Sequence, residues 1–65
     1  MKIKVKQIHV MQKVFAENGT YTYQKTIILI NKNMTTKEYK QRQKQAANDF
    51  NVPQNMVGGI YENLK

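Results

Sequence analysis

The chain has 65 residues, no cysteine and one histidine, and its net charge is +7, from 11 Lys and Arg against 4 Asp and Glu. These numbers predict one small domain spanning residues 1–65 and exclude a disulfide framework or a thiolate metal site. No unbroken apolar stretch matches a signal peptide or a membrane span, so we expect a cytoplasmic protein with no membrane partner. The positive charge favours a polyanionic partner, of which nucleic acid is the first candidate.

The stretch VFAENGTYTYQ, residues 14–24, carries the strongest local signal in the chain. Asn-Gly between two alternating runs favours a two-residue type I′ turn, because both central residues of that turn need positive φ. We therefore predict a long hairpin whose loop is Asn18-Gly19. Counting outward from this loop predicts an apolar face built from the cross-strand pairs Ile8–Leu29, Val10–Ile27 and Val14–Tyr23. The other face is mixed and can meet water.

The first strand contains a change of phase. Ile3 and Val5 alternate with lysines, but they are out of step with Ile8 and Val10. All four side chains can reach one face only if the strand bulges or bends near Lys6-Gln7. We predict a bulge there.

The predicted register also limits the core. It places Gln12 opposite Lys25 on the apolar face, and a lysine is almost never fully buried without a partner. We expect the core to end at that pair, so that residues 13–24 project from the body as an arm. This arm would present four candidate binding residues: Lys13, Phe15, Tyr21 and Tyr23.

The segment NMTTKEY predicts the start of a helix. Thr35 and Glu38 have capping-box spacing, and Met34 and Tyr39 have the spacing of a hydrophobic staple. The helix should run from Thr36 to Phe50, since Asn51 can adopt a left-handed cap and Pro53 prevents continuation. Its narrow apolar stripe consists of Tyr39, Gln43, Ala46 and Phe50.

The outer surface of this helix is basic. Lys37, Lys40 and Lys44 follow one flank at helical spacing, and Arg42 lies on the other side. Such a row is usually an ordinary solvated face, but in a chain of this charge it is also a candidate phosphate-contacting stripe.

The last stretch, NVPQNMVGGIYENLK, has two interpretations. As a helix, it gives the run AANDFNVPQNMVGGI, which resembles the helix-turn-helix pattern of many bacterial DNA-binding proteins. That resemblance implies that Gln54, Asn55 and Gly58 face the major groove. The match departs from the pattern, because Asn51 stands in place of the usual turn glycine and two adjacent glycines weaken a recognition helix.

As a strand, residues 56–61 would return from the helix and pair beside the first strand. We favour the strand, because Asn, Val, Gly, Gly, Ile and Tyr together make a poor helix. The predicted fold class is therefore α+β: a long β-hairpin packed on one amphipathic helix, with a short C-terminal third strand and strand order 2-1-3.

Catalysis has little support in the sequence. His9, four scattered acids and no cysteine do not supply a nucleophile, a base and an orienting group. The Gly58-Gly59 pair lacks the Gly spacing and the following Lys-Ser/Thr of a phosphate-binding loop. We expect a protein that is not an enzyme and uses no cofactor or metal.

Two classes of function remain. In the first, a small basic protein binds DNA or RNA, with lysines and Arg42 on phosphates and the arm aromatics on unpaired bases or in a groove. In the second, a small module or inhibitor docks on an acidic protein partner through a strand edge or the helix flank. The small core and the open strand edges also predict a homodimer.

Overall fold

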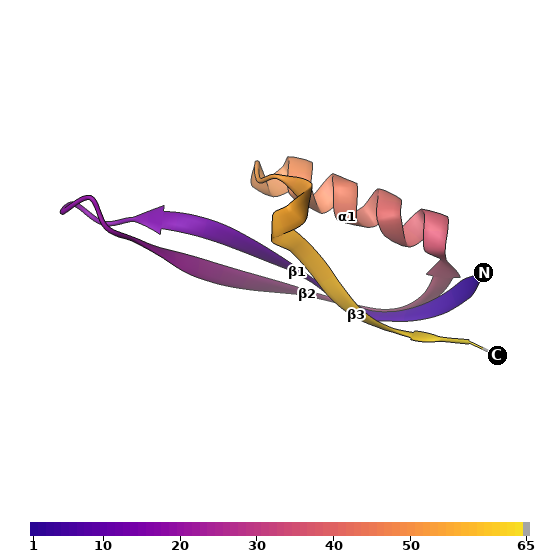
Figure 1. Cartoon of the computed structure of the whole chain (residues 1–65). Coiled ribbons are helices and arrows are strands. Elements are labelled where there is room, and N and C mark those ends of the chain that lie inside the picture. Colours follow the sequence, from indigo (N-terminus) through magenta and orange to yellow (C-terminus); the bar gives the residue numbers. More distant parts are fainter. Residues whose placement is uncertain (65) are drawn as a thin grey trace.

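The computed structural model describes residues 1–64. Over that range the chain forms a three-stranded antiparallel sheet of order β2-β1-β3 with one helix on it (Figure 1). The elements are β1 (Lys2–Phe15), β2 (Tyr21–Thr35), α1 (Thr36–Phe50), a short 3₁₀ turn (Gln54–Met56) and β3 (Val57–Asn63). The predicted α+β class, strand order and helix bounds are confirmed.

The hairpin loop differs from the predicted two-residue turn. The backbone N–H of Ala16 donates to the Thr20 carbonyl at 2.8 Å, which leaves three loop residues between these two. Within the loop Gly19 has positive φ (85°) and Asn18 does not, as in a type I turn followed by a glycine bulge. The Asn18 side chain explains the choice, since its Oδ1 accepts hydrogen bonds from the Thr20 N–H (3.2 Å) and hydroxyl (2.7 Å).

The longer loop shifts the hairpin register by one residue. Ile8 pairs with Ile28 and Val10 with Thr26, so the predicted pairs Ile8–Leu29, Val10–Ile27 and Val14–Tyr23 are wrong. Because side chains alternate along a strand, the shift exchanges the two faces of β2. Ile28 and Ile30 pack against the core, whereas Ile27 and Leu29 lie on the opposite face with exposures of 51% and 75%.

The predicted bulge in β1 is confirmed. The register changes between Val5 and Gln7 in the pairing with β2 and again in the pairing with β3. As a result Ile3, Val5, Ile8 and Val10 all belong to the core, each no more than 2% exposed.

The helix begins and ends as expected. The Glu38 N–H donates to the Thr35 hydroxyl (3.1 Å) and a Glu38 carboxylate oxygen accepts from the Thr35 N–H (3.4 Å), which completes the capping box. Asn51 caps the other end in the left-handed region. Met34, Tyr39, Ala46 and Ala47 are the other buried apolar side chains of the described residues.

The core ends beyond Val10, and the hairpin continues as an arm. Gln12 pairs with Gln24, and its side-chain amide donates to the Phe50 carbonyl at 3.3 Å. Beyond this contact the hairpin extends away from the helix (Figure 1), and residues 13–25 are all exposed. The predicted arm is confirmed, although Lys25 pairs with Met11 and not with Gln12.

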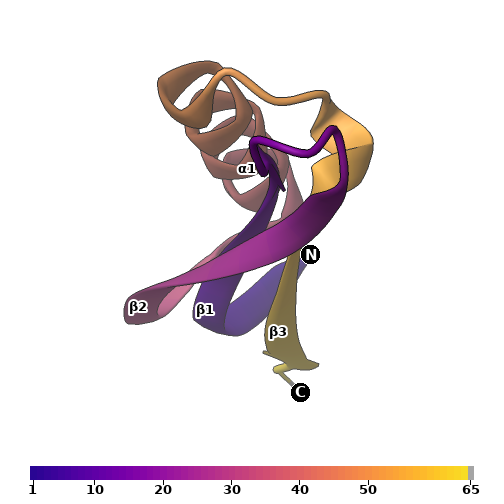
Figure 2. The same ribbon diagram turned by 90° about the vertical axis from the view of Figure 1, so that its left-hand side faces the viewer.

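The C-terminal stretch is a strand, so the helix-turn-helix alternative is wrong. The strand depends on Gly59: a Cβ added at this residue would come within 2.7 Å of the Gln7 carbonyl oxygen and would meet the Tyr39 hydroxyl. Only glycine permits this close approach of β3 to β1 and α1. Tyr61 then packs on Tyr39 with ring centroids 5.3 Å apart. Seen along the arm, α1 lies over one face of the sheet, and no described element covers the other (Figure 2).

Candidate functional site

The four predicted arm residues gather on one face of the hairpin. Lys13 pairs with Tyr23, and Phe15 pairs with Tyr21. Residues two apart on a strand share a face, so these two adjacent pairs form one four-residue group. We call Lys13, Phe15, Tyr21 and Tyr23 the arm cluster.

The arm cluster is held together by its rings and exposed to solvent. The centroids of Phe15 and Tyr21 are 6.0 Å apart, and those of Tyr21 and Tyr23 are 5.8 Å apart in an edge-to-face arrangement. Lys13 Nζ lies 4.5 Å from the Tyr21 ring centroid, a cation–π distance. The three rings are 46–67% exposed. Such a group offers π-faces and a positive charge to a ligand at one place.

The actual register is what unites this cluster. The predicted register would have placed Lys13 and Phe15 on the face opposite Tyr21 and Tyr23. The observed register also adds a basic residue that was not predicted for this site. Lys25 pairs with Met11 and lies on the same face as the arm cluster. The spacing of 21, 23 and 25 along one strand already indicated this shared face. The assignment of Lys25 to the apolar face obscured it.

The four predicted helix residues lie on two different flanks of α1. Lys37, Lys40 and Lys44 are exposed on one flank of α1. Arg42 lies on the other flank, where it lines a shallow hollow with Ile8, Ile28 and Ile30. By strand alternation, α1 covers the face of the sheet opposite the arm cluster. The structure therefore does not bring the helix lysines, Arg42 and the arm cluster into one patch.

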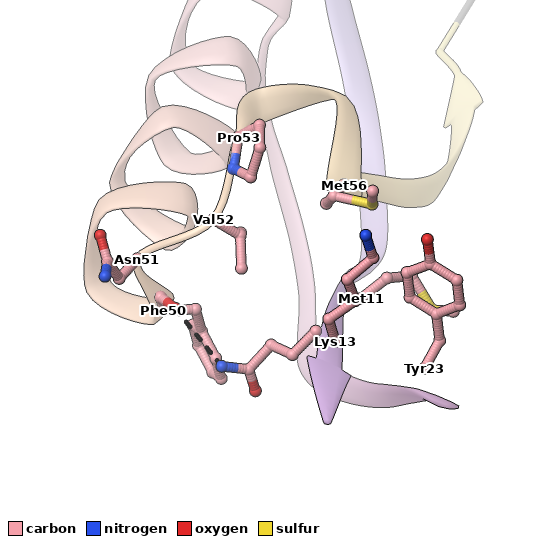
Figure 3. Close-up of a pocket in the computed structure, with 9 residues that line it drawn as sticks. Met11, Lys13, Tyr23, Phe50, Asn51, Val52, Pro53 and Met56 are labelled. Atoms are coloured by element: carbon pink, nitrogen blue, oxygen red, sulfur yellow. Dashed lines mark hydrogen bonds between the residues drawn. The ribbon is translucent and has the colours of Figure 1, made fainter. Parts of the chain in front are cut away.

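A cleft of about 440 Å³ lies at the base of the arm. Figure 3 shows Phe50, Val52 and Pro53 on one side of it and Lys13 and Tyr23 on the other. The cleft was not predicted, because it depends on how the connection from α1 to β3 meets β1. Its walls are mainly apolar, with the amide of Gln12 and the Lys13 ammonium as donors, which suits a flat ligand group held next to the arm cluster.

Most basic side chains of residues 1–64 form no ion pair within that range. Lys6 Nζ and Glu62 Oε1 are 2.9 Å apart, and within residues 1–64 no other ion pair is closer than 4.0 Å. Lys6, through a hydrogen bond and its charge, lowers the pKa of Glu62. Apart from Lys6, the basic residues of the described chain are therefore free to meet an anionic ligand.

The remaining chemistry of residues 1–64 is sparse. No three of their His, Asp and Glu side chains come close enough together to hold a metal ion. The Nδ1 atom of His9 is buried without a hydrogen-bond partner among these residues, and the ring rests against Gly58. The described helix is too short and too polar to span a membrane.

The chain was also compared with known proteins. No protein-family model, no curated protein and no solved structure matches it.

Proposed function

We propose that this protein binds nucleic acid without catalysing a reaction, and that the arm cluster is its main contact with bases. The observation that carries the proposal is the group of three exposed aromatic rings and Lys13 on one face of a projecting hairpin. Aromatic side chains beside basic ones are the usual components of sites for unpaired bases, because every base has a π-face and every nucleotide a phosphate.

The arrangement favours single strands. Phe15, Tyr21 and Tyr23 present their rings near one another on one face, so bases of a flexible strand can stack on them in succession. Lys13 and Lys25, on the same face, are positioned to neutralise the phosphates between those bases. A two-stranded ribbon can also enter a major groove, but base pairs there leave no free π-face for the rings.

The helix lysines have a secondary role in this proposal. Lys37, Lys40 and Lys44 lie on α1, away from the arm cluster, and each is exposed. They would contact phosphates of a longer ligand and add affinity that does not depend on base sequence.

Fluorescence anisotropy with single-stranded DNA, single-stranded RNA and duplex DNA, each at several salt concentrations, tests the proposal. Tyr21→Ala and Phe15→Ala should each weaken binding to single strands by about 1–3 kcal/mol and leave the salt slope nearly unchanged. Val14→Ala is the matched control, because Val14 is an exposed arm residue on the opposite face. Replacing Lys37, Lys40 and Lys44 by Ala should lower the salt slope by roughly one unit per lost phosphate contact.

The absence of binding would contradict the proposal. At low salt even non-specific basic proteins bind polyanions, so a wild-type protein with no affinity for any of the three ligands is not a nucleic-acid-binding protein. An acidic protein partner would then be the better interpretation of the unpaired lysines.

A further inference from the structure

We propose that the face of the sheet opposite α1 is the interface of a homodimer. This open face consists of two rows of side chains that run across the three strands. Leu29, Gln7 and Ile60 form one row, and Ile27, His9 and Gly58 form the next. The arm cluster lies on the same face of the hairpin, farther along it and beyond the Met11–Lys25 pair, and shares no residue with the two rows.

The open face is apolar where a solvent-facing sheet would be polar. A sheet with a helix on one face normally shows polar side chains on the other. Here Leu29 is 75% exposed, Ile27 is 51% exposed and Ile60 is 49% exposed, and the two rows contain no charged residue. Aliphatic side chains gain nothing from stacking on bases, so the chemistry indicates a protein surface as the occupant.

The relief of the face favours a second copy of this chain. Ile27 and Leu29 stand side by side on β2 as a ridge. On the other edge strand, β3, Gly58 has no side chain and the His9 ring lies against it, whereas Ile60 is exposed, so the surface of β3 is low at Gly58 and not at Ile60. A twofold axis parallel to the strands would place the β2 ridge of each copy over β3 of the other. The fit would then occur twice, as in any isologous interface.

The size of the core supports the same occupant. The described residues bury only eight apolar side chains in the monomer, and two of these are alanines. A domain of about 60 residues buries a smaller fraction of its surface than a larger domain does, about 60%, and its own copy is the partner always present to extend the core. The charged residues of this face lie at its ends, Lys25 in one direction and Lys4, Glu62 and its partner Lys6 in the other, so the repulsion between copies acts at the rim.

This geometry has a consequence for the arms. With the axis parallel to the strands, the two hairpins run in the same direction and project from the same end of the dimer. If the arm cluster binds single strands, as proposed above, the dimer presents two such clusters to one ligand. The dimer itself does not depend on that function.

Sedimentation equilibrium of the full chain between about 10 and 500 µM is the first test. We expect a dimer whose association is maintained or strengthened by added salt, because both copies carry the same charge. Leu29→Gln should make the protein monomeric at concentrations where wild type is dimeric. Val14→Gln, an exposed aliphatic residue of the arm outside the open face, should stay dimeric. A monomeric wild type, or an unchanged dimer of Leu29→Gln, would overturn the proposal. An acidic protein would then be the next candidate occupant.

Because the chain has no cysteine, oxidative cross-linking can test the arrangement of the two copies. A mixture of Leu29→Cys and Ile60→Cys should form the mixed disulfide faster than either variant forms its own. Faster homodimer formation by Leu29→Cys alone would place β2 over β2 and reject the parallel axis. Tyr21→Ala should remain dimeric while losing affinity for single strands. The dimer and the binding function are therefore tested independently of each other.

Discussion

At the scale of single residues, the two adjacent glycines of β3 have different tolerances for a side chain. An added Cβ at Gly59 would meet the Gln7 backbone carbonyl at 2.7 Å and the hydroxyl of the buried residue Tyr39, neither of which can move freely. An added Cβ at Gly58 would meet only the imidazole of His9, the end of a side chain on the open face.

We therefore expect Gly59→Ala to lower the free energy of unfolding by about 1–3 kcal/mol, the usual effect of overpacking. Gly58→Ala should be nearly neutral, because the His9 ring can rotate and alanine fits a strand better than glycine. Urea denaturation of both variants measures the difference. Equal destabilisation by the two substitutions would mean that β3 does not lie against β1 and α1 as described.

Tyr39 should limit stability at high pH. Burial, and to a smaller degree the nearby Tyr61, raises the pKa of the Tyr39 phenol. The folded state therefore favours the neutral, protonated form. Its contribution to stability is complete below the unfolded value of about 10 and is lost as pH rises through the higher folded value.

The expected result is a steeper loss of stability between pH 9.5 and 11 for wild type than for Tyr39→Phe, measured by urea denaturation at each pH. Tyr21→Phe is the control, since Tyr21 is exposed on the arm and should keep the wild-type slope. A Tyr39→Phe protein with the wild-type pH profile would show that the buried phenol does not titrate with folding.

At the scale of secondary-structure elements, the sequence predicted most where the signal was local. The helix follows from the capping box of Thr35 and Glu38 and from the cap at Asn51, all within one turn of its ends. The bulge near Lys6 follows from a phase change that any register must absorb. The predicted hairpin register was wrong because it was counted outward from a two-residue loop, whereas the loop has three residues. Asn18 bonds to Thr20 through its side chain and does not take the left-handed conformation that a two-residue turn requires.

The one-residue error in the predicted register also limited how much of the candidate site could be predicted. The four arm residues were identified by type, since aromatic and basic side chains on an exposed hairpin are readable from sequence. Their common face was not, because a one-residue shift exchanges the faces of β2. The cleft beside Phe50 and the apolar open face depend on contacts between distant segments, which local patterns do not specify.

The arm should be separable from the fold. Its residues contribute no buried side chain, so deleting residues 14–15 and 21–22 shortens both strands by one two-residue repeat and leaves the pairing of the loop intact. The urea midpoint should change little, because the core ends at Val10. Affinity for single-stranded DNA should fall, because Phe15 and Tyr21 are removed. Circular dichroism and anisotropy on the same preparation check both outcomes. A shortened protein that fails to fold would mean that the arm belongs to the cooperative unit.

At the scale of the whole molecule, shape and charge act together. The protein is elongated, with principal extents of 50 × 16 × 14 Å, because the arm adds length without adding width. The core and α1 occupy one end of the elongated molecule, and the hairpin arm forms the other end (Figure 1). If the protein binds nucleic acid as proposed, its elongated shape would let it contact several nucleotides of one strand, and its affinity should then depend on ligand length.

If both proposals hold, ligand length should reveal the two arms of the dimer. A single strand just long enough for one arm cluster binds with the affinity of that site alone. A strand that reaches both clusters converts the second contact into an intramolecular one, and the apparent affinity rises by about 10²-fold or more. Anisotropy with a series of oligothymidines at fixed salt should show this step for wild type. The Leu29→Gln monomer should keep the affinity for short strands and lose the step. A smooth rise with length in both proteins would instead indicate independent binding of single molecules, and would separate nucleic-acid binding from the dimer.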